Sequence, residues 1–160
     1  MNIGRFICIG GILTTITVLF QSAPVFLPTI GMALSPLSTL PVAIAAASNI
    51  ALGFTVFFSS ALILVLVSVQ ETIILLFTTG LLGIVIGTFL YRKGIIISIL
   101  FSSIALSLGM ILLTYIVGIS SLSTPLIFLI FFTFSLVYAS IWNIYFRKFM
   151  NYLINMNLIS

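Results

Sequence analysis

Few residues of this chain could do chemistry, and Glu71 carries its only side-chain carboxylate. An ionisable group in so apolar a chain is a functional hypothesis by default. Six membrane crossings, which the charge distribution indicates, would bring Glu71 to the same membrane face as Gln21, Gln70, Thr114 and Tyr115. Amides, a phenol and one carboxylate could together bind a small polar or aromatic molecule. They could equally be helix caps and hydrated boundary residues, and the sequence leaves both interpretations open.

Most catalytic chemistry is excluded by the residues that the chain lacks. It has no histidine and only one acidic residue, so carboxylate dyads, Ser–His pairs and metal sites built on histidine cannot form. The single cysteine, Cys8, excludes an internal disulfide. Lys93 and Lys148 each follow an arginine near an expected helix end, where a lysine side chain reaches the membrane surface. We therefore predict a protein that is not an enzyme and holds neither a metal nor a cofactor.

The overall composition is that of a membrane protein. Hydrophobic residues make up 62% of the chain, charged residues only 4%, and the mean hydropathy is +1.49. A soluble domain needs about a quarter of its residues charged to solvate its surface. Lipid must therefore be the solvent of this chain. Its five basic residues lie in three places and form no patch suited to nucleic acid.

The positions of the charges predict six membrane-spanning helices. Uncharged runs at 6–70, 72–91 and 94–146 have room for three, one and two spans of about 20 residues each. The apolar run after Arg5 is too long for a secretory signal, so it counts as a retained span. The expected spans are 3–20, 37–50, 54–69, 72–90, 95–117 and 126–145. The chain is therefore expected to be an all-α six-helix bundle over residues 1–148, with a cytoplasmic or interfacial tail at 149–160.

The same arrangement gives a consistent orientation. With the N-terminus inside the cell, all basic residues fall on the cytoplasmic side and Glu71 falls on the outer side. Basic residues near span ends favour the cytoplasm. We expect a multi-pass protein of the cell membrane with both termini in the cytoplasm.

Four of the five prolines lie between residues 23 and 41, at positions 24, 28, 36 and 41. Proline cannot donate a backbone hydrogen bond and disfavours helix in the residue before it. The stretch 23–41 is therefore expected to be a loop-rich excursion on the outer face, long enough to fold over a binding site.

Small residues indicate where helices approach closely. Gly83 and Gly87 form a GxxxG pair, and Thr79 extends that stripe by one turn. A second stripe of small residues follows one face of the first span, at Gly4, Cys8, Gly11 and Thr15. That second stripe could dock another membrane subunit, or it could pack internally against the glycines of the fourth span.

Several features resemble the substrate-binding membrane subunits, or S components, of energy-coupling factor transporters. These features are the glycines in 9–13, the Pro-x-x-x-x-Pro element at 36–41, the alanine-rich second helix, and the glycines in 80–87 followed by a basic turn. The resemblance implies a six-helix binder of a small solute, often a vitamin, whose first outer loop closes the site. It also implies a transmembrane scaffold partner that carries two cytoplasmic ATPases. The docking face of that family uses alanines four residues apart, and the stripe of the present first span departs from this pattern.

Two functions from different classes remain. One is a membrane subunit that binds a small solute for uptake driven by partner ATPases. The other is a membrane protein that assembles or stabilises another membrane complex without transport. A homo-oligomeric channel formed through the GxxxG pair is a third hypothesis, although no polar stripe long enough to line a pore is visible.

Overall fold

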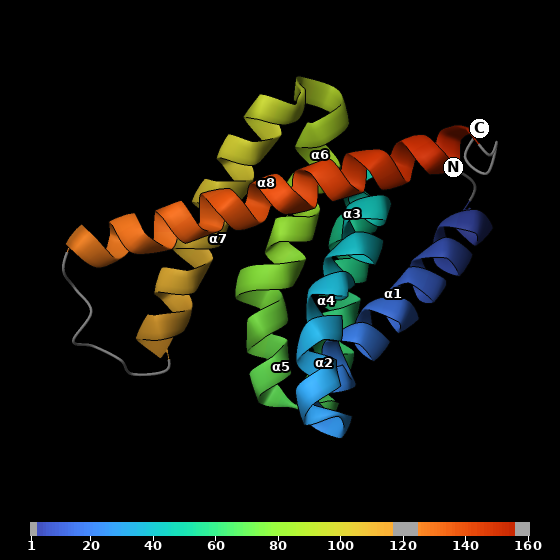
Figure 1. Cartoon of the computed structure of the whole chain (residues 1–160). Helices are drawn as coiled ribbons and strands as arrows, with labels where there is room; N and C mark the ends of the chain where they lie inside the picture. The colour runs from blue at the N-terminus through green and yellow to red at the C-terminus, as the bar shows by residue number, and fades with distance from the viewer. Residues whose placement is uncertain (1–2, 117–124, 156–160) are drawn as a thin grey trace.

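The structure is a computed structural model that describes residues 3–116 and 125–155, and all its regular elements are helices (Figure 1). The α-helices are α1 (Ile3–Phe26), α2 (Pro28–Leu34), α3 (Thr39–Ser48), α4 (Ile50–Val67), α5 (Val69–Ile74), α6 (Gly80–Lys93), α7 (Ile95–Ile116) and α8 (Pro125–Asn155). A 3₁₀ turn, η1 (Ser35–Ser38), joins α2 to α3. A π-helical segment, η2 (Leu75–Thr79), joins α5 to α6.

Six helical stretches are long and apolar enough to cross a membrane, which confirms the predicted fold class at that level. They are Ile3–Phe26, Pro28–Ser48, Ile50–Val67, Val69–Leu90, Ile95–Ile116 and Phe128–Tyr152. The second stretch combines α2, η1 and α3, and the fourth combines α5, η2 and α6. Two of the six stretches are therefore interrupted helices, and both interruptions lie inside the apolar part of the chain.

The prediction of a loop at 23–41 is wrong, because this stretch is almost entirely helical. The helix α1 continues through Pro24 to Phe26, and a single residue, Leu27, separates it from α2. Pro28 and Pro36 lie in the first turns of α2 and η1, and Pro41 lies in the first turn of α3. Backbone N–H groups of a first turn have no partner within the helix, so a proline there costs little. The prolines therefore begin short helices.

The GxxxG pair of α6 packs against α3. A Cβ atom added at Gly83 would lie 2.8 Å from the carbonyl oxygen of Thr39, and one added at Gly87 would lie 2.7 Å from the Cβ atom of Ala46. Two helices can approach this closely only where side chains are absent. The GxxxG pair therefore serves internal packing, and the hypothesis of a homo-oligomeric channel joined through these glycines is wrong.

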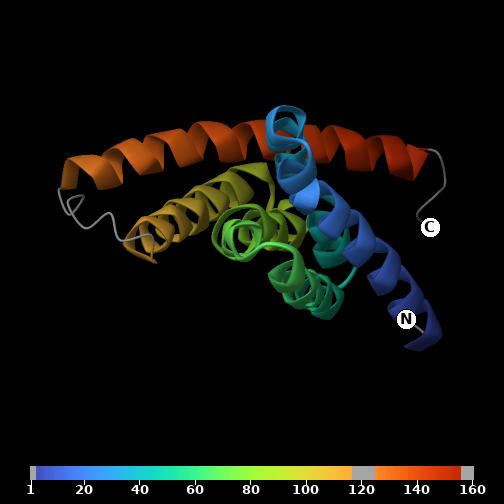
Figure 2. The same cartoon turned by 90° about the horizontal axis from the view of Figure 1, so that it is seen from below.

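The small-residue stripe of α1 faces outward. Cys8 and Thr15 are exposed, and nothing lies within 4 Å of a Cβ atom added at Gly4 or Gly11. The N-terminal half of α1 diverges from the other helices in both views (Figures 1 and 2). The stripe therefore does not pack against the glycines of α6, and that alternative is wrong.

The last helix, α8, crosses the other helices instead of running beside them (Figures 1 and 2). Ala139, Phe146 and Met150 of α8 are buried in a cluster with Leu82 and Ile86 of α6. The helix continues to Asn155, so the first part of the expected tail belongs to α8, and residues 156–160 lie outside the described part of the chain. Most of the connection between the expected spans 95–117 and 126–145 also lies outside it.

A buried hydrogen bond joins α7 to α8, and it yields a prediction. The Ser98 hydroxyl donates to Asn143 Oδ1 over 2.5 Å, and Asn143 Nδ2 donates to the carbonyl of Ala139 over 2.8 Å. Hydrogen bonds between membrane helices contribute about 0.6 kcal/mol on average and up to ~1.7 kcal/mol. Asn143→Ala should lower the free energy of unfolding in detergent by about 1 kcal/mol. Ser140→Ala, which removes only a bond within α8, is the control, and an equal effect of both changes would contradict the prediction.

Candidate functional site

Four polar side chains from four different elements meet inside the helix bundle. They are Gln21 of α1, Ser38 of η1, Glu71 of α5 and Thr79 of η2. Gln21 and Ser38 are fully buried, and Glu71 and Thr79 are only 6% and 7% exposed. We call these four residues the polar junction.

The side-chain amide of Gln21 is the centre of the polar junction. Its Nε2 atom donates to Glu71 Oε2 over 2.8 Å. Its Oε1 atom accepts two hydrogen bonds, from the Ser38 hydroxyl over 2.7 Å and from the Thr79 hydroxyl over 2.8 Å. An amide oxygen has two lone pairs, so Oε1 is fully used, while one N–H of the amide has no partner among these four residues. The amide therefore links three separate parts of the chain.

Local helix chemistry places Glu71 in the junction. Ser68 is the N-cap of α5, and its hydroxyl accepts from the backbone N–H of Glu71 over 3.4 Å. A serine N-cap satisfies an otherwise unpaired N–H group of a helix start. The carboxylate then lies in the first turn of α5, where the helix dipole stabilises negative charge. The start of α5 thus provides a favourable position for the only acidic residue of the chain.

The π segment η2 places Thr79. The backbone N–H of Gly80 donates to the carbonyl of Leu75, five residues earlier, as a π turn requires. The helix α7 packs closely on this widened turn, since a Cβ atom at Gly109 would overlap the carbonyl oxygen of Phe77. Short π segments are frequent at functional sites. Here the segment ends at the residue whose hydroxyl joins the junction.

The junction can hold elements together, and its groups could also bind a polar ligand. A buried carboxylate or amide is costly to leave without partners in an apolar interior. These groups therefore bind one another when nothing else is present, and a ligand with matching donors and acceptors could replace those bonds. A proton relay needs several titratable groups, and this chain has one acid. Within residues 3–116 and 125–155, no cluster of metal-ligating side chains occurs.

The structure brings together two of the five residues expected to bind a ligand. Gln21 and Glu71 are hydrogen-bonded directly to each other. Glu71 is buried, whereas the alternative interpretation is a hydrated charge at the membrane boundary. Gln70 is exposed. Thr114 donates to a carbonyl of its own helix, and Tyr115 is 79% exposed.

Two members of the junction were not expected to have this role. Thr79 was expected to serve helix packing, and its hydroxyl instead donates to Gln21. Ser38 lies where the expected loop at 23–41 overlaps the expected span at 37–50, and neither prediction gives its hydroxyl a partner. The signal was present in the sequence, since Ser35-Pro36 is a typical helix start that would place Ser38 within a turn.

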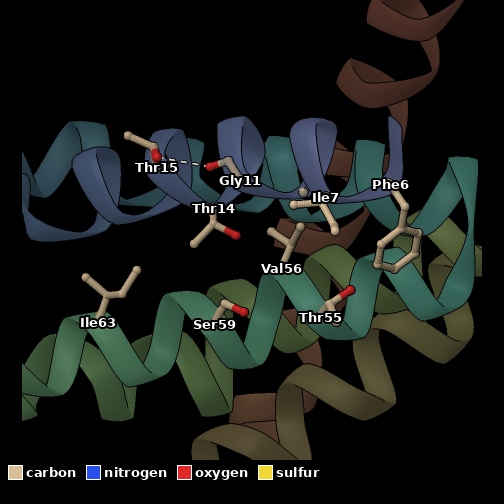
Figure 3. A pocket seen from close by; sticks show the side chains of 10 residues that line it. Phe6, Ile7, Gly11, Thr14, Thr15, Thr55, Val56, Ser59 and Ile63 are labelled. Carbon is tan, nitrogen blue, oxygen red and sulfur yellow. Dashed lines mark hydrogen bonds between the residues drawn. The ribbon is translucent and has the colours of Figure 1, made fainter. Parts of the chain in front are cut away.

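A second polar feature lies between α1 and α4 (Figure 3). It is a groove of about 430 Å³ lined on α1 by Gly10, Gly11 and Thr14 and on α4 by Thr55 and Ser59, among others. Thr14 is only 7% exposed, and its hydroxyl points into the groove without a hydrogen-bond partner among the described residues (Figure 3). We call this feature the α1–α4 groove.

Comparison with models of protein families, with curated proteins and with solved structures gives no match for this chain.

Proposed function

We propose that this protein is an integral membrane subunit that binds a small polar solute for uptake, with ATP hydrolysed by partner subunits. The observation that carries the proposal is the polar junction: the only carboxylate of the chain is buried among apolar helices and bonded to a buried amide. An ionisable residue placed in this way is rare in membrane proteins and marks binding or transport sites.

Solute binding would use the junction's own hydrogen-bonding groups. Glu71 can accept hydrogen bonds from N–H or O–H groups of a solute, and Gln21 can both donate and accept. The neighbouring elements are short: α2 has 7 residues and η1 has 4. Short elements with few internal hydrogen bonds open at lower cost than long helices. Movement of residues 28–38 would release Ser38 from Gln21 and admit a solute.

The energy source and the orientation belong to the same proposal. The chain has no Gly-x-x-x-x-Gly-Lys-Ser/Thr phosphate-binding loop, so ATP hydrolysis would occur in partners, as in the transporters that the sequence resembles. Arg92 and Lys93 lie at the far end of the α5–η2–α6 run from Glu71. Basic residues favour the cytoplasmic side, which would place the junction toward the outer side of the cell membrane and both termini in the cytoplasm.

A second candidate function is the assembly of another membrane complex. It is favoured by the exposed small-residue stripe of α1 together with Thr14 in the adjoining groove, whose hydroxyl has no hydrogen-bond partner in the described part of the chain. Small residues let a foreign helix approach, and a hydroxyl without a partner can bond across the contact. In this case the polar junction would serve only to hold the helices together.

One purification experiment tests both candidates. The tagged protein is isolated from its own cells in mild detergent, and co-purifying proteins and small molecules are identified by mass spectrometry. Solute binding predicts an ATPase pair, a membrane scaffold and a small molecule retained in roughly equimolar amount. Glu71→Gln keeps an acceptor for Gln21 but removes the charge, so it should reduce the retained solute at least tenfold. Gln70→Ala, at an exposed position, should not change it.

The assembly function predicts the opposite pattern. An unrelated membrane complex would then co-purify without ATPases and without a solute, and Glu71→Gln would leave its recovery unchanged. Gly11→Leu, which adds a bulky side chain to the exposed face of α1, would remove that complex. This second pattern would refute solute uptake.

A further inference from the structure

Within residues 3–116 and 125–155, no basic side chain is paired with the only acidic side chain. The chain has five basic residues and one acidic residue, Glu71, which is bonded to Gln21. Arg92 lies 21 residues after Glu71 along the continuous α5–η2–α6 run. That separation is about 30 Å along a helix axis at ~1.5 Å per residue. Glu71 therefore cannot pair with Arg92 or the adjacent Lys93, and both exposed cations are open to an anion from another molecule.

These two cations lie at one end of an apolar groove. The groove has a volume of about 340 Å³ and runs between the start of α4 and the last turns of α6. Its lining includes Ile50 and Phe54 of α4, Val85 and Phe89 of α6, and then Arg92 and Lys93. It is almost entirely apolar except for the two basic side chains at its end. We call it the α4–α6 groove.

The wall of this groove is fixed and offers no free hydroxyl. Thr88, which also lines it, donates its hydroxyl to the carbonyls of Ile84 and Val85 within its own helix. The Phe89 ring stacks on Phe101 of α7, with ring centroids 4.7 Å apart and planes inclined by only 7°. A polar solute would therefore find few partners along the groove, whereas a hydrocarbon chain would find a preformed apolar wall.

We propose that the α4–α6 groove binds one anionic glycerophospholipid, with an acyl chain along the groove and the phosphate at Arg92 and Lys93. The charge of the site and its apolar extension together fit a ligand that is both anionic and hydrocarbon-bearing. Basic pockets between membrane helices bind anionic lipid headgroups in this way. The two cations lie in the last turn of α6, where the helix dipole favours positive charge.

A matched pair of charge variants tests this site. Arg92→Gln with Lys93→Gln removes the two cations of the groove. Arg147→Gln with Lys148→Gln removes the same charge from α8, whose Arg147 lines a separate hollow beside Gly94. All four residues are exposed, so both double variants should fold. Each protein is titrated in detergent with dioleoyl phosphatidylglycerol and, separately, with dioleoyl phosphatidylcholine, and bound lipid is counted by native mass spectrometry.

The expected result is specific to the groove. The change at 92 and 93 should weaken phosphatidylglycerol binding roughly thirtyfold, since each basic residue contributes about five- to sixfold near an anionic lipid. The change at 147 and 148 should weaken it less than threefold. Val85→Trp, which fills the groove and leaves both charges in place, should also reduce binding.

Four outcomes would overturn the proposal. Equal losses in the two double variants would show adsorption through net charge alone. No loss in either would show that these cations do not bind the lipid. Phosphatidylcholine binding as tightly as phosphatidylglycerol would remove the requirement for an anion. Displacement of the lipid by millimolar inorganic phosphate would indicate a site for free phosphate without an acyl chain.

Discussion

Gly87→Val should destabilise the protein by about 3 kcal/mol or prevent its recovery as a folded monomer. Even a Cβ atom at this position would lie 2.7 Å from the Cβ atom of Ala46, and it would also overlap the carbonyl oxygen of Ala43. Overpacking costs typically ~1–3 kcal/mol, and the upper end applies where the obstacle is backbone that cannot rotate away. The two helices would have to separate, which would also loosen the core around Ile86.

Gly11→Val is the control for this experiment. It makes the same chemical change in another helix, and nothing lies within 4 Å of its added Cβ atom. Thermal unfolding of both variants in the same detergent, with the yield of monodisperse protein, measures the difference. Similar stability of the two variants would show that α3 and α6 do not approach each other as described.

Gln21→Leu should cost about 3 kcal/mol of stability, because it removes the centre of the polar junction. The buried Glu71 would lose its amide donor, and the hydroxyls of Ser38 and Thr79 would lose their acceptor. A buried polar group left without a partner costs about 1–3 kcal/mol, and a buried charge costs more. Leucine keeps most of the side-chain volume, so the loss would report hydrogen bonds more than packing.

A double variant separates the polar effect from other causes. Adding Glu71→Leu to Gln21→Leu removes the stranded charge, so part of the lost stability should return. Gln70→Leu is the control, because Gln70 is exposed beside Glu71 and lies outside the junction. If the double variant is as unstable as the sum of its single changes, the two side chains are not coupled.

The sequence predicted the number of apolar helices because lipid imposes a strong constraint on composition, although the second helical stretch is Pro28–Ser48 and not 37–50. Every span needs about 20 apolar residues, so the few charges marked the boundaries between groups of spans. The prediction of a loop in the proline-rich stretch is wrong because proline breaks a helix only beyond its first turn. Pro28 and Pro36 occupy first turns, where the missing N–H group has no consequence for helix hydrogen bonding.

The polar junction was predicted only in part, for a different reason. Gln21 and Glu71 were noticeable as rare polar residues in apolar surroundings, and residue type alone singled them out. Ser38 and Thr79 belong to a large population of serines and threonines that mostly bond to their own helix, as Thr114 does. Only the three-dimensional arrangement shows which of these hydroxyls reaches across to another element.

The π segment η2 changes the direction in which the side chains of one apolar helical stretch point. An extra residue within a helical turn rotates everything beyond it by about 100°, since an α-helix turns once in ~3.6 residues. Before the shift, Glu71 is turned toward α1, and after it, Gly83 and Gly87 are turned toward α3. One span can thus meet two neighbours with unrelated chemistry, a polar one and a close-packed one. The polar contacts at the start of this span can therefore vary without disturbing the close packing of α6 on α3.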